Sequence, residues 1–251
     1  MERHVGLSIR RKVTIGLLAV YWPALAIFSH LPVPMWVRKA GVSDKVLHLL
    51  AYMILAFLLW CAIGGGARLS PGRASAWLVF LVVVLYGGAD ELVQGYVGRS
   101  CDIVDFAADV AGALAGLVVF WFLPFWPAAL LVAGTAVFGL TNLTRTSLSE
   151  LLGVTSAVFH LFAHGVFALI WVRNVELYSA PKAPRARWLP AAAGVPIAFL
   201  LLVKVFSAVF RRDFSLRDVA FSLLGIMLVV FGVLLARSAG RRANGGNRGA
   251  A

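Results

Sequence analysis

The chain has 251 residues, of which 61% are hydrophobic and 14% are charged. Soluble domains usually carry about 25% charged residues, and the hydrophobic residues here run in blocks long enough to span a bilayer. This composition excludes a soluble enzyme or a soluble binding module. The net charge of +12 is typical of basic cytoplasmic loops in a membrane protein, so we expect no nucleic-acid partner.

Apolar blocks follow one another along the whole chain. They predict membrane-spanning helices at 13–30, 46–64, 76–96, 102–123, 128–140, 156–171, 189–210 and 219–235. The last stretch, 238–251, is basic and rich in glycine, which predicts a disordered tail. We therefore expect an all-α, polytopic membrane helical bundle of about eight spans.

Lys and Arg are dense in the two terminal tails and in the loop 172–188. Such clusters favour the cytoplasmic side of a membrane. An even number of spans places both termini on one side, so we expect both termini in the cytoplasm. Most acidic residues then fall at the outer ends of the spans, which predicts a site that faces outward.

The two halves of the chain are similar. HLLAYMILAFLLW at His48 resembles HLFAHGVFALIWV at His160, and RSCDIVDFAADVAG at Arg99 resembles RDFSLRDVAFSLLG at Arg212. Both pairs lie at nearly the same separation, which predicts two parallel four-helix repeats, 1–124 and 125–237. The second half has Lys204, Ser207, Ser215, Ser222 and His164 where the first has Glu91, Gln94, Asp102, Asp109 and Tyr52. We therefore expect a degenerate second repeat and place the chemistry in the first.

Charged and polar residues gather at the expected outer ends of three spans in the first repeat. An ionisable side chain inside a membrane segment is costly, so each one needs a partner or a function. Asp44, His48 and Tyr52 share one helix face because they are four residues apart. Glu91, Asp105 and His48 are the candidate catalytic acid–base groups. The candidate ligand-binding residues are Asp44, Lys45, Tyr52, Gln94, Arg99 and Asp102.

Each of these residues also has a structural explanation. Asp102 suits a helix N-cap, and Asp105 gains from the positive N-terminal end of a helix. Arg99 is placed to pair with either of them. Gly112 and Gly116 form a small-xxx-small pattern that predicts close helix packing. The cysteines and histidines show no metal-binding spacing, and we expect neither a metal nor a cofactor.

These motifs together resemble the VanZ-like family of integral membrane proteins. The family pattern reads here as SDKVLHLLAY at 43–52, ELVQGYVGR at 91–99 and DIVDFAADVAG at 102–112. Asp109 departs from the pattern, which more often has Asn, so we expect a structural role for it. The resemblance implies a protein of the bacterial cytoplasmic membrane and cell envelope. The family name comes from a member linked to teicoplanin resistance, and the resemblance supplies no reaction.

Three functions remain compatible with these residues. The first is recognition of an anionic lipid or lipid-linked cell-surface component, with Arg99, Lys45 and His48 at the phosphate. The second is a proton-coupled membrane transporter, in which Glu91 and Asp105 would titrate. The third is a non-catalytic membrane assembly protein, in which the charges only cap and pair helices. The sequence leaves open whether the protein is an enzyme, and its oligomeric state.

Overall fold

The computed structural model describes residues 8–30, 44–70, 72–97, 101–142, 153–179, 185–210 and 215–246. All regular structure in this part of the chain is helical. Eight of its helices are long and apolar enough to cross a bilayer, which confirms the predicted membrane helical bundle. The helices form two compact units, Met1–Thr146 and Ser147–Ala251.

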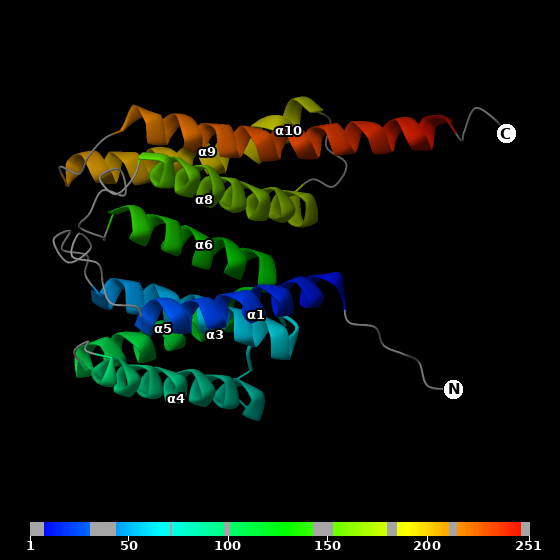
Figure 1. Cartoon of the computed structure of the whole chain (residues 1–251). Helices are drawn as coiled ribbons and strands as arrows, with labels where there is room; N and C mark the ends of the chain where they lie inside the picture. The colour runs from blue at the N-terminus through cyan, green and yellow to red at the C-terminus, as the bar shows by residue number, and fades with distance from the viewer. Residues whose placement is uncertain are drawn as a thin grey trace, which may run out of the picture. The chain divides into compact units, whose positions relative to one another are not determined.

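The first unit is built around one buried helix. Its described helices are α1 (Ile9–His30), α3 (Asp44–Gly64), α4 (Ala74–Tyr96), α5 (Ile103–Phe122) and α6 (Phe125–Asn142) (Figure 1). Helix α3 packs most extensively on α5 and also contacts α1, α4 and α6. This explains why α3 is almost continuously apolar after Tyr52, since it faces protein on every side.

Two glycines allow α3 and α5 to approach closely. A Cβ atom added to Gly112 would collide with the carbonyl oxygen of Leu49, and one added to Gly116 would collide with that of Met53. The order of these contacts shows that α3 and α5 run parallel. Backbone contact of this kind requires residues without a side chain at the crossing.

Side chains of α1 form hydrogen bonds with the C-terminal end of α3. Helix α3 ends where Gly65 and Gly66 adopt positive φ angles of 64° and 72°, a conformation that glycine adopts without strain. The free carbonyl oxygens there accept side-chain hydrogen bonds: Arg11 Nε donates to Ala62 O at 2.8 Å, and Arg10 donates to Gly65 O at 2.6 Å. Helix α1 therefore runs antiparallel to α3.

The fifth span begins at Phe125 and not at residue 128. Pro127 falls in the first turn of α6, where its missing N–H has no helical partner to lose. Helix α6 packs on α3 and α5, so it belongs to the first unit in space. The predicted end of the first repeat at residue 124 is therefore not the end of this unit.

The second unit contains α8 (Gly153–Asn174), a π-helical turn η1 (Val175–Ser179), α9 (Arg185–Val209) and α10 (Leu216–Gly246). A Cβ on Gly225 of α10 would collide with the carbonyl oxygen of Leu161 on α8. Helices α8 and α10 therefore cross as closely as α3 and α5 do. Ala168, Trp188 and Ile226 belong to the buried apolar core of this unit.

Helix α10 continues beyond the predicted end of the last span at residue 235. The prediction of a disordered tail from residue 238 is corrected for 238–246, which are helical. Arg237 lies over the ring of Trp188 at 4.7 Å, which extends packing past the apolar stretch.

Candidate functional site

The ends of four helices meet at one end of the first unit. They are the C-terminal ends of α1 and α4 and the N-terminal ends of α3 and α5. We call this region the acidic end, because it holds the carboxylates of Asp44, Asp90, Glu91, Asp102, Asp105 and Asp109. The antiparallel order of the chain gathers these residues, which are distant in sequence.

A buried histidine–aspartate pair lies at the centre of the acidic end. His48 Nδ1 of α3 is 2.8 Å from Asp109 Oδ1 of α5. Glu91 Oε1 of α4 is 3.8 Å from the same nitrogen. All three residues are buried, and Asp109 is fully inaccessible. The sequence analysis gave Asp109 a structural role, yet the structure places it at the core of the candidate site.

A second set of charges lies nearer the surface. Lys45 Nζ is 3.1 Å from Asp102 Oδ2 and 3.2 Å from Asp105 Oδ1. The Lys45 side chain keeps 47% of its surface exposed, so it forms the accessible rim of the acidic end. Arg99, which was expected to pair with these aspartates, lies outside the described residues. Among the described residues, Lys45 is the cation that pairs with both aspartates.

Asp102 caps α5 and connects the rim to the buried pair. Its Oδ1 accepts a hydrogen bond from Val104 N–H at 2.9 Å, and its own N–H donates to Glu91 Oε2 at 3.1 Å. The Val104 N–H and the Lys45 ammonium both hold the pKa of Asp102 below its ordinary value. Asp102 is therefore a permanently charged cap at neutral pH.

Asp90 forms a separate buried network. Its Oδ1 accepts from Ser29 Oγ at 2.7 Å, and its Oδ2 accepts from Gln94 Nε2 at 3.1 Å. His30 Nε2 is 3.5 Å from Asp90 Oδ1. Sequence analysis singled out Gln94 but missed Ser29 and His30. Both were missed because, in the sequence, they are simply the polar end of the first apolar block.

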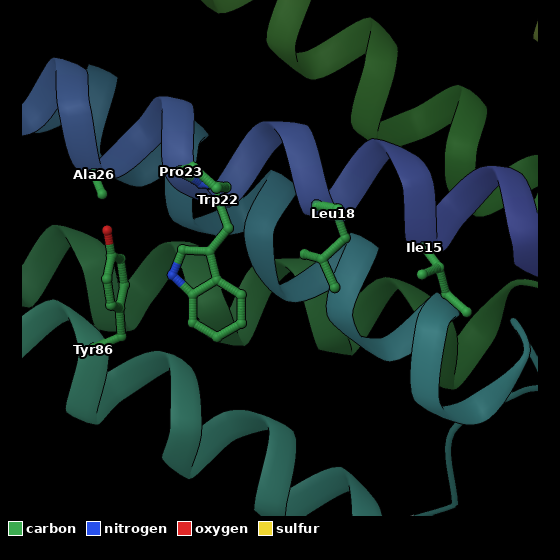
Figure 2. Close-up of a pocket in the computed structure, with 7 residues that line it drawn as sticks. Ile15, Leu18, Trp22, Pro23, Ala26 and Tyr86 are labelled. Atoms are coloured by element: carbon green, nitrogen blue, oxygen red, sulfur yellow. The ribbon is translucent and has the colours of Figure 1, made fainter.

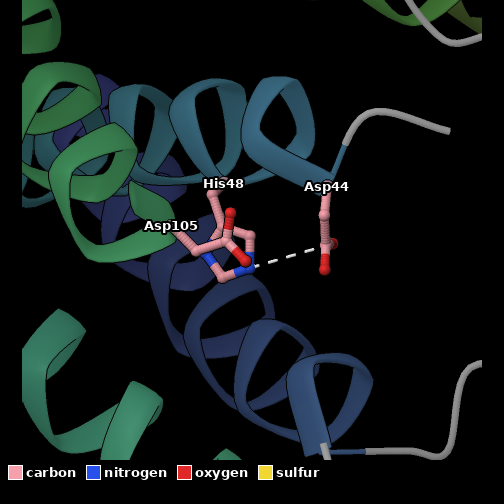
Figure 3. A group of neighbouring side chains, drawn as sticks. All are labelled: Asp44, His48 and Asp105. Atoms are coloured by element: carbon pink, nitrogen blue, oxygen red, sulfur yellow. Dashed lines mark ion pairs between the residues drawn. The ribbon is translucent and has the colours of Figure 1, made fainter. Parts of the chain in front are cut away.

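Aromatic rings enclose the buried pair on one side. The Tyr52 ring stacks on His48 at 6.4 Å between centroids, and Tyr86 stacks on Tyr52 at 5.9 Å. On the other side, Asp44 Oδ1 is 3.9 Å from His48 Nε2 (Figure 3). Asp105 completes this outer group. His48 is thus held between a carboxylate at each ring nitrogen.

Two buried carboxylate oxygens have no hydrogen-bond donor among the described residues. They are Glu91 Oε1 and Asp109 Oδ2, which flank His48. A buried acceptor without a partner costs about 1–3 kcal/mol, and more when it is charged. The site is therefore incomplete as a purely structural network.

An apolar groove runs along α1 beside the acidic end. It has a volume of about 430 Å³. Figure 2 shows the side chains that line it between α1 and α4: Ile15, Leu18, Trp22, Pro23, Ala26 and Tyr86. Ala26 is one helical turn from His30, and Tyr86 reaches Tyr52 and so the His48 ring. One end of the groove therefore lies next to the buried polar site, with Tyr86 and Tyr52 between the groove and His48.

The second unit contains a related arrangement with different charges. His160 Nε2 is 3.5 Å from Asp218 Oδ2, and the His164 ring stacks on His160 at 5.7 Å between centroids. Lys204 and Ser222 are both buried there, at the positions that the predicted repeat aligns with Glu91 and Asp109. This unit therefore lacks the two carboxylates that surround His48.

These features define a class of protein: a polytopic membrane helical bundle with a buried histidine–carboxylate cluster at one end of its helices. Residues 10–124 match the model of the VanZ/LLP1 family. Over α1, α3, α4 and α5 the chain is therefore similar to this family, as its motifs indicated. Comparisons with curated proteins and with solved structures gave no match.

Proposed function

We propose that the first unit binds an amphiphilic component of the cell envelope, with its anionic head group at the acidic end. The observation that carries this proposal is the apolar groove whose end lies next to a polar site. A lipid chain fits the groove along α1, while the head group reaches Lys45 at the rim. His48 and Glu91, beneath the rim, would act as acid and base toward that head group.

The distribution of polar groups supports a site at head-group depth. The buried polar residues of α3 stop at Tyr52. Beyond them the Phe120 ring stacks on Phe57 at 5.0 Å between centroids and lies tilted against Trp60 at 6.4 Å. A proton-coupled transporter needs polar groups through the full thickness of the membrane. The described helices of this unit offer no buried charged side chain in that apolar half, which favours binding from one side.

We infer that the two units descend from a duplicated four-helix repeat and that the second has lost the site. Three pairs of observations support this origin: the contacts Gly112–Leu49 and Gly225–Leu161, the stacked rings beside His48 and His160, and the buried residues at equivalent positions. Lys204 and Ser222 replace the two carboxylates, so the second unit would serve as a scaffold.

We further propose that the acidic end faces outward from the bacterial cytoplasmic membrane, with both termini in the cytoplasm. The basic residues Arg10, Arg11 and Lys12 at the opposite end of the first unit support this orientation. Accessibility of a cysteine introduced at Lys45, in a variant in which Cys61 and Cys101 are replaced by serine, to a membrane-impermeant reagent in whole cells tests it. Labelling only after the membrane is opened would overturn the orientation.

Native mass spectrometry of the protein released from its own membrane tests the lipid proposal. The wild type should retain a phosphate-bearing polyprenyl lipid or glycolipid, and Lys45→Gln should lose it. Lys12→Gln is the matched control, because it removes the same charge at the other end of the unit. Retention of bulk phospholipid alone, equal in all three proteins, would favour an assembly role.

A further inference from the structure

Three metal-ligand groups converge within the acidic end from three different helices. One ligand atom each from His48, Glu91 and Asp109 can be chosen so that all lie within 4.8 Å of one another. The shortest separation is the 2.8 Å between His48 Nδ1 and Asp109 Oδ1. The group is buried, in contrast to the partly exposed group that includes Asp44.

The unpartnered oxygens give independent evidence for a ligand here. Glu91 Oε1 and Asp109 Oδ2 accept no hydrogen bond from any described residue, and their residues are only 3% and 0% exposed. Glu91 Oε1 faces His48 Nδ1 at 3.8 Å. A bound cation would satisfy carboxylates that the protein itself leaves incomplete.

The charge balance of the acidic end also favours a cation. Among the described residues, Lys45 is the one Lys or Arg side chain at this end, and it already pairs with Asp102 and Asp105. The buried carboxylates of Glu91 and Asp109 therefore have only His48 nearby. Like charges this close repel each other unless a positive charge lies between them.

We propose that His48, Glu91 and Asp109 bind one divalent transition-metal ion, with Zn²⁺ and Mn²⁺ as the candidates. One imidazole nitrogen and two carboxylates suit these ions better than Mg²⁺ or Ca²⁺, which prefer oxygen ligands alone. Three protein ligands leave a coordination position open, as in catalytic metal sites. That position suits water or an oxygen of a phosphate group.

The surroundings of the three ligands fit this role. Asp44 Oδ1 lies near His48 Nε2, where a carboxylate orients a ligating imidazole and raises its basicity. Tyr52 stacks on the imidazole ring and limits its rotation. The second unit keeps His160 but has Lys204 and Ser222 at the other two positions, so it should bind no metal. The metal site rests on these contacts and does not depend on the proposed lipid. With the ion bound, His48 and Glu91 are its ligands and do not act as acid and base.

The test uses the full chain in detergent, stripped with a chelator and then equilibrated with Zn²⁺ or Mn²⁺ alone. Elemental analysis should find about one retained ion per wild-type chain. Glu91→Gln and Asp109→Asn should each weaken binding more than about tenfold, since even outer-shell changes cost roughly 10–100-fold. His160→Gln is the matched control and should bind as the wild type does.

Pulsed electron paramagnetic resonance of Mn²⁺ bound to the wild type provides a second readout that needs no folded variant. Coupling to a ¹⁴N nucleus is expected from His48, and it should persist in His160→Gln. The proposal is overturned if the wild type retains no ion or if the bound Mn²⁺ shows no nitrogen coupling. Equal retention in Glu91→Gln, Asp109→Asn and wild type would overturn it as well.

Discussion

His48 and Asp109 join α3 to α5 through a 2.8 Å contact inside the apolar first unit. The contact lies next to the crossing at which Gly112 touches the backbone of Leu49. Because the two helices are held at backbone contact there, a short carboxylate reaches a histidine on the neighbouring helix. The close packing and the buried pair are therefore parts of one arrangement.

Gly112→Ala should disrupt this arrangement. The added methyl group would collide with the carbonyl oxygen of Leu49, which belongs to the backbone and cannot rotate away as a side chain could. We expect a loss of about 1–3 kcal/mol in the free energy of unfolding, or failure to assemble. Gly232→Ala is the control, because its Cβ meets nothing within 4 Å and alanine favours helix. Titration with a denaturing detergent measures both, and equal stability of the two variants would contradict the packing.

The His48–Asp109 pair should show strong coupling in a double-mutant cycle. His48→Ala or Asp109→Ala alone leaves a buried polar partner, which costs about 3–5 kcal/mol for a buried ion pair. The double variant should lose much less than the sum of the two. His160 and Ser222 occupy the equivalent positions, but Ser222 Oγ donates to Asp218 O. Their cycle should give coupling near zero, and similar coupling in both cycles would refute the assignment.

Asp102→Asn should change how stability depends on pH. Asn still caps α5 but loses the charge that pairs with Lys45. The pKa of Asp102 is lowered from its ordinary 3.8, so its stabilising effect is complete above that value and disappears as the pH falls through the lowered pKa. Thermal unfolding should show the wild type more stable at neutral pH, with the difference disappearing as the pH falls below 3.8 through the lowered pKa of Asp102. A difference in stability between wild type and Asp102→Asn that does not change with pH would contradict the ion pair.

Gly65 and Gly66 offer a matched comparison at the end of α3. Both have positive φ, so alanine at either position should cost about 1–2 kcal/mol of backbone strain. A Cβ on Gly66 would also press on the Phe125 ring at 2.7 Å, whereas Gly65 has open space. Gly66→Ala should therefore be the more damaging substitution in thermal unfolding. The opposite order would show that α6 does not pack there.

The sequence was sufficient to predict the membrane bundle and most of the residues at the acidic end. The length of each apolar block predicts a membrane-spanning helix directly, and the spacing of Asp44, His48 and Tyr52 predicts that they share one helix face. It was not sufficient to predict which groups pair. Lys45 reaches Asp102 and Asp105 only because α3 and α5 run parallel and in contact, a tertiary relationship that spacing along the chain does not encode.

Asp109 is a residue whose place in the candidate site was not predicted from the sequence. Its departure from the family pattern predicted a structural role, and the structure adds that it is buried beside His48 and Glu91. Ser29 and His30 join the site through α1, whose antiparallel packing on α3 brings them beside Asp90. The helical extension of α10 depends on Arg237 packing against Trp188, which a composition-based expectation of disorder cannot include.

Photocrosslinking tests the central claim most directly. A polyprenyl phosphate with a diazirine in its isoprenoid chain would be added to the purified protein, and the labelled residues identified by mass spectrometry. Labels should concentrate on the groove between Leu18 and Ala26 and on Tyr86, and Lys45→Gln should reduce them. Labelling spread equally over lipid-facing positions outside the groove, such as Leu81 and Leu85, would contradict an envelope-lipid site at the acidic end.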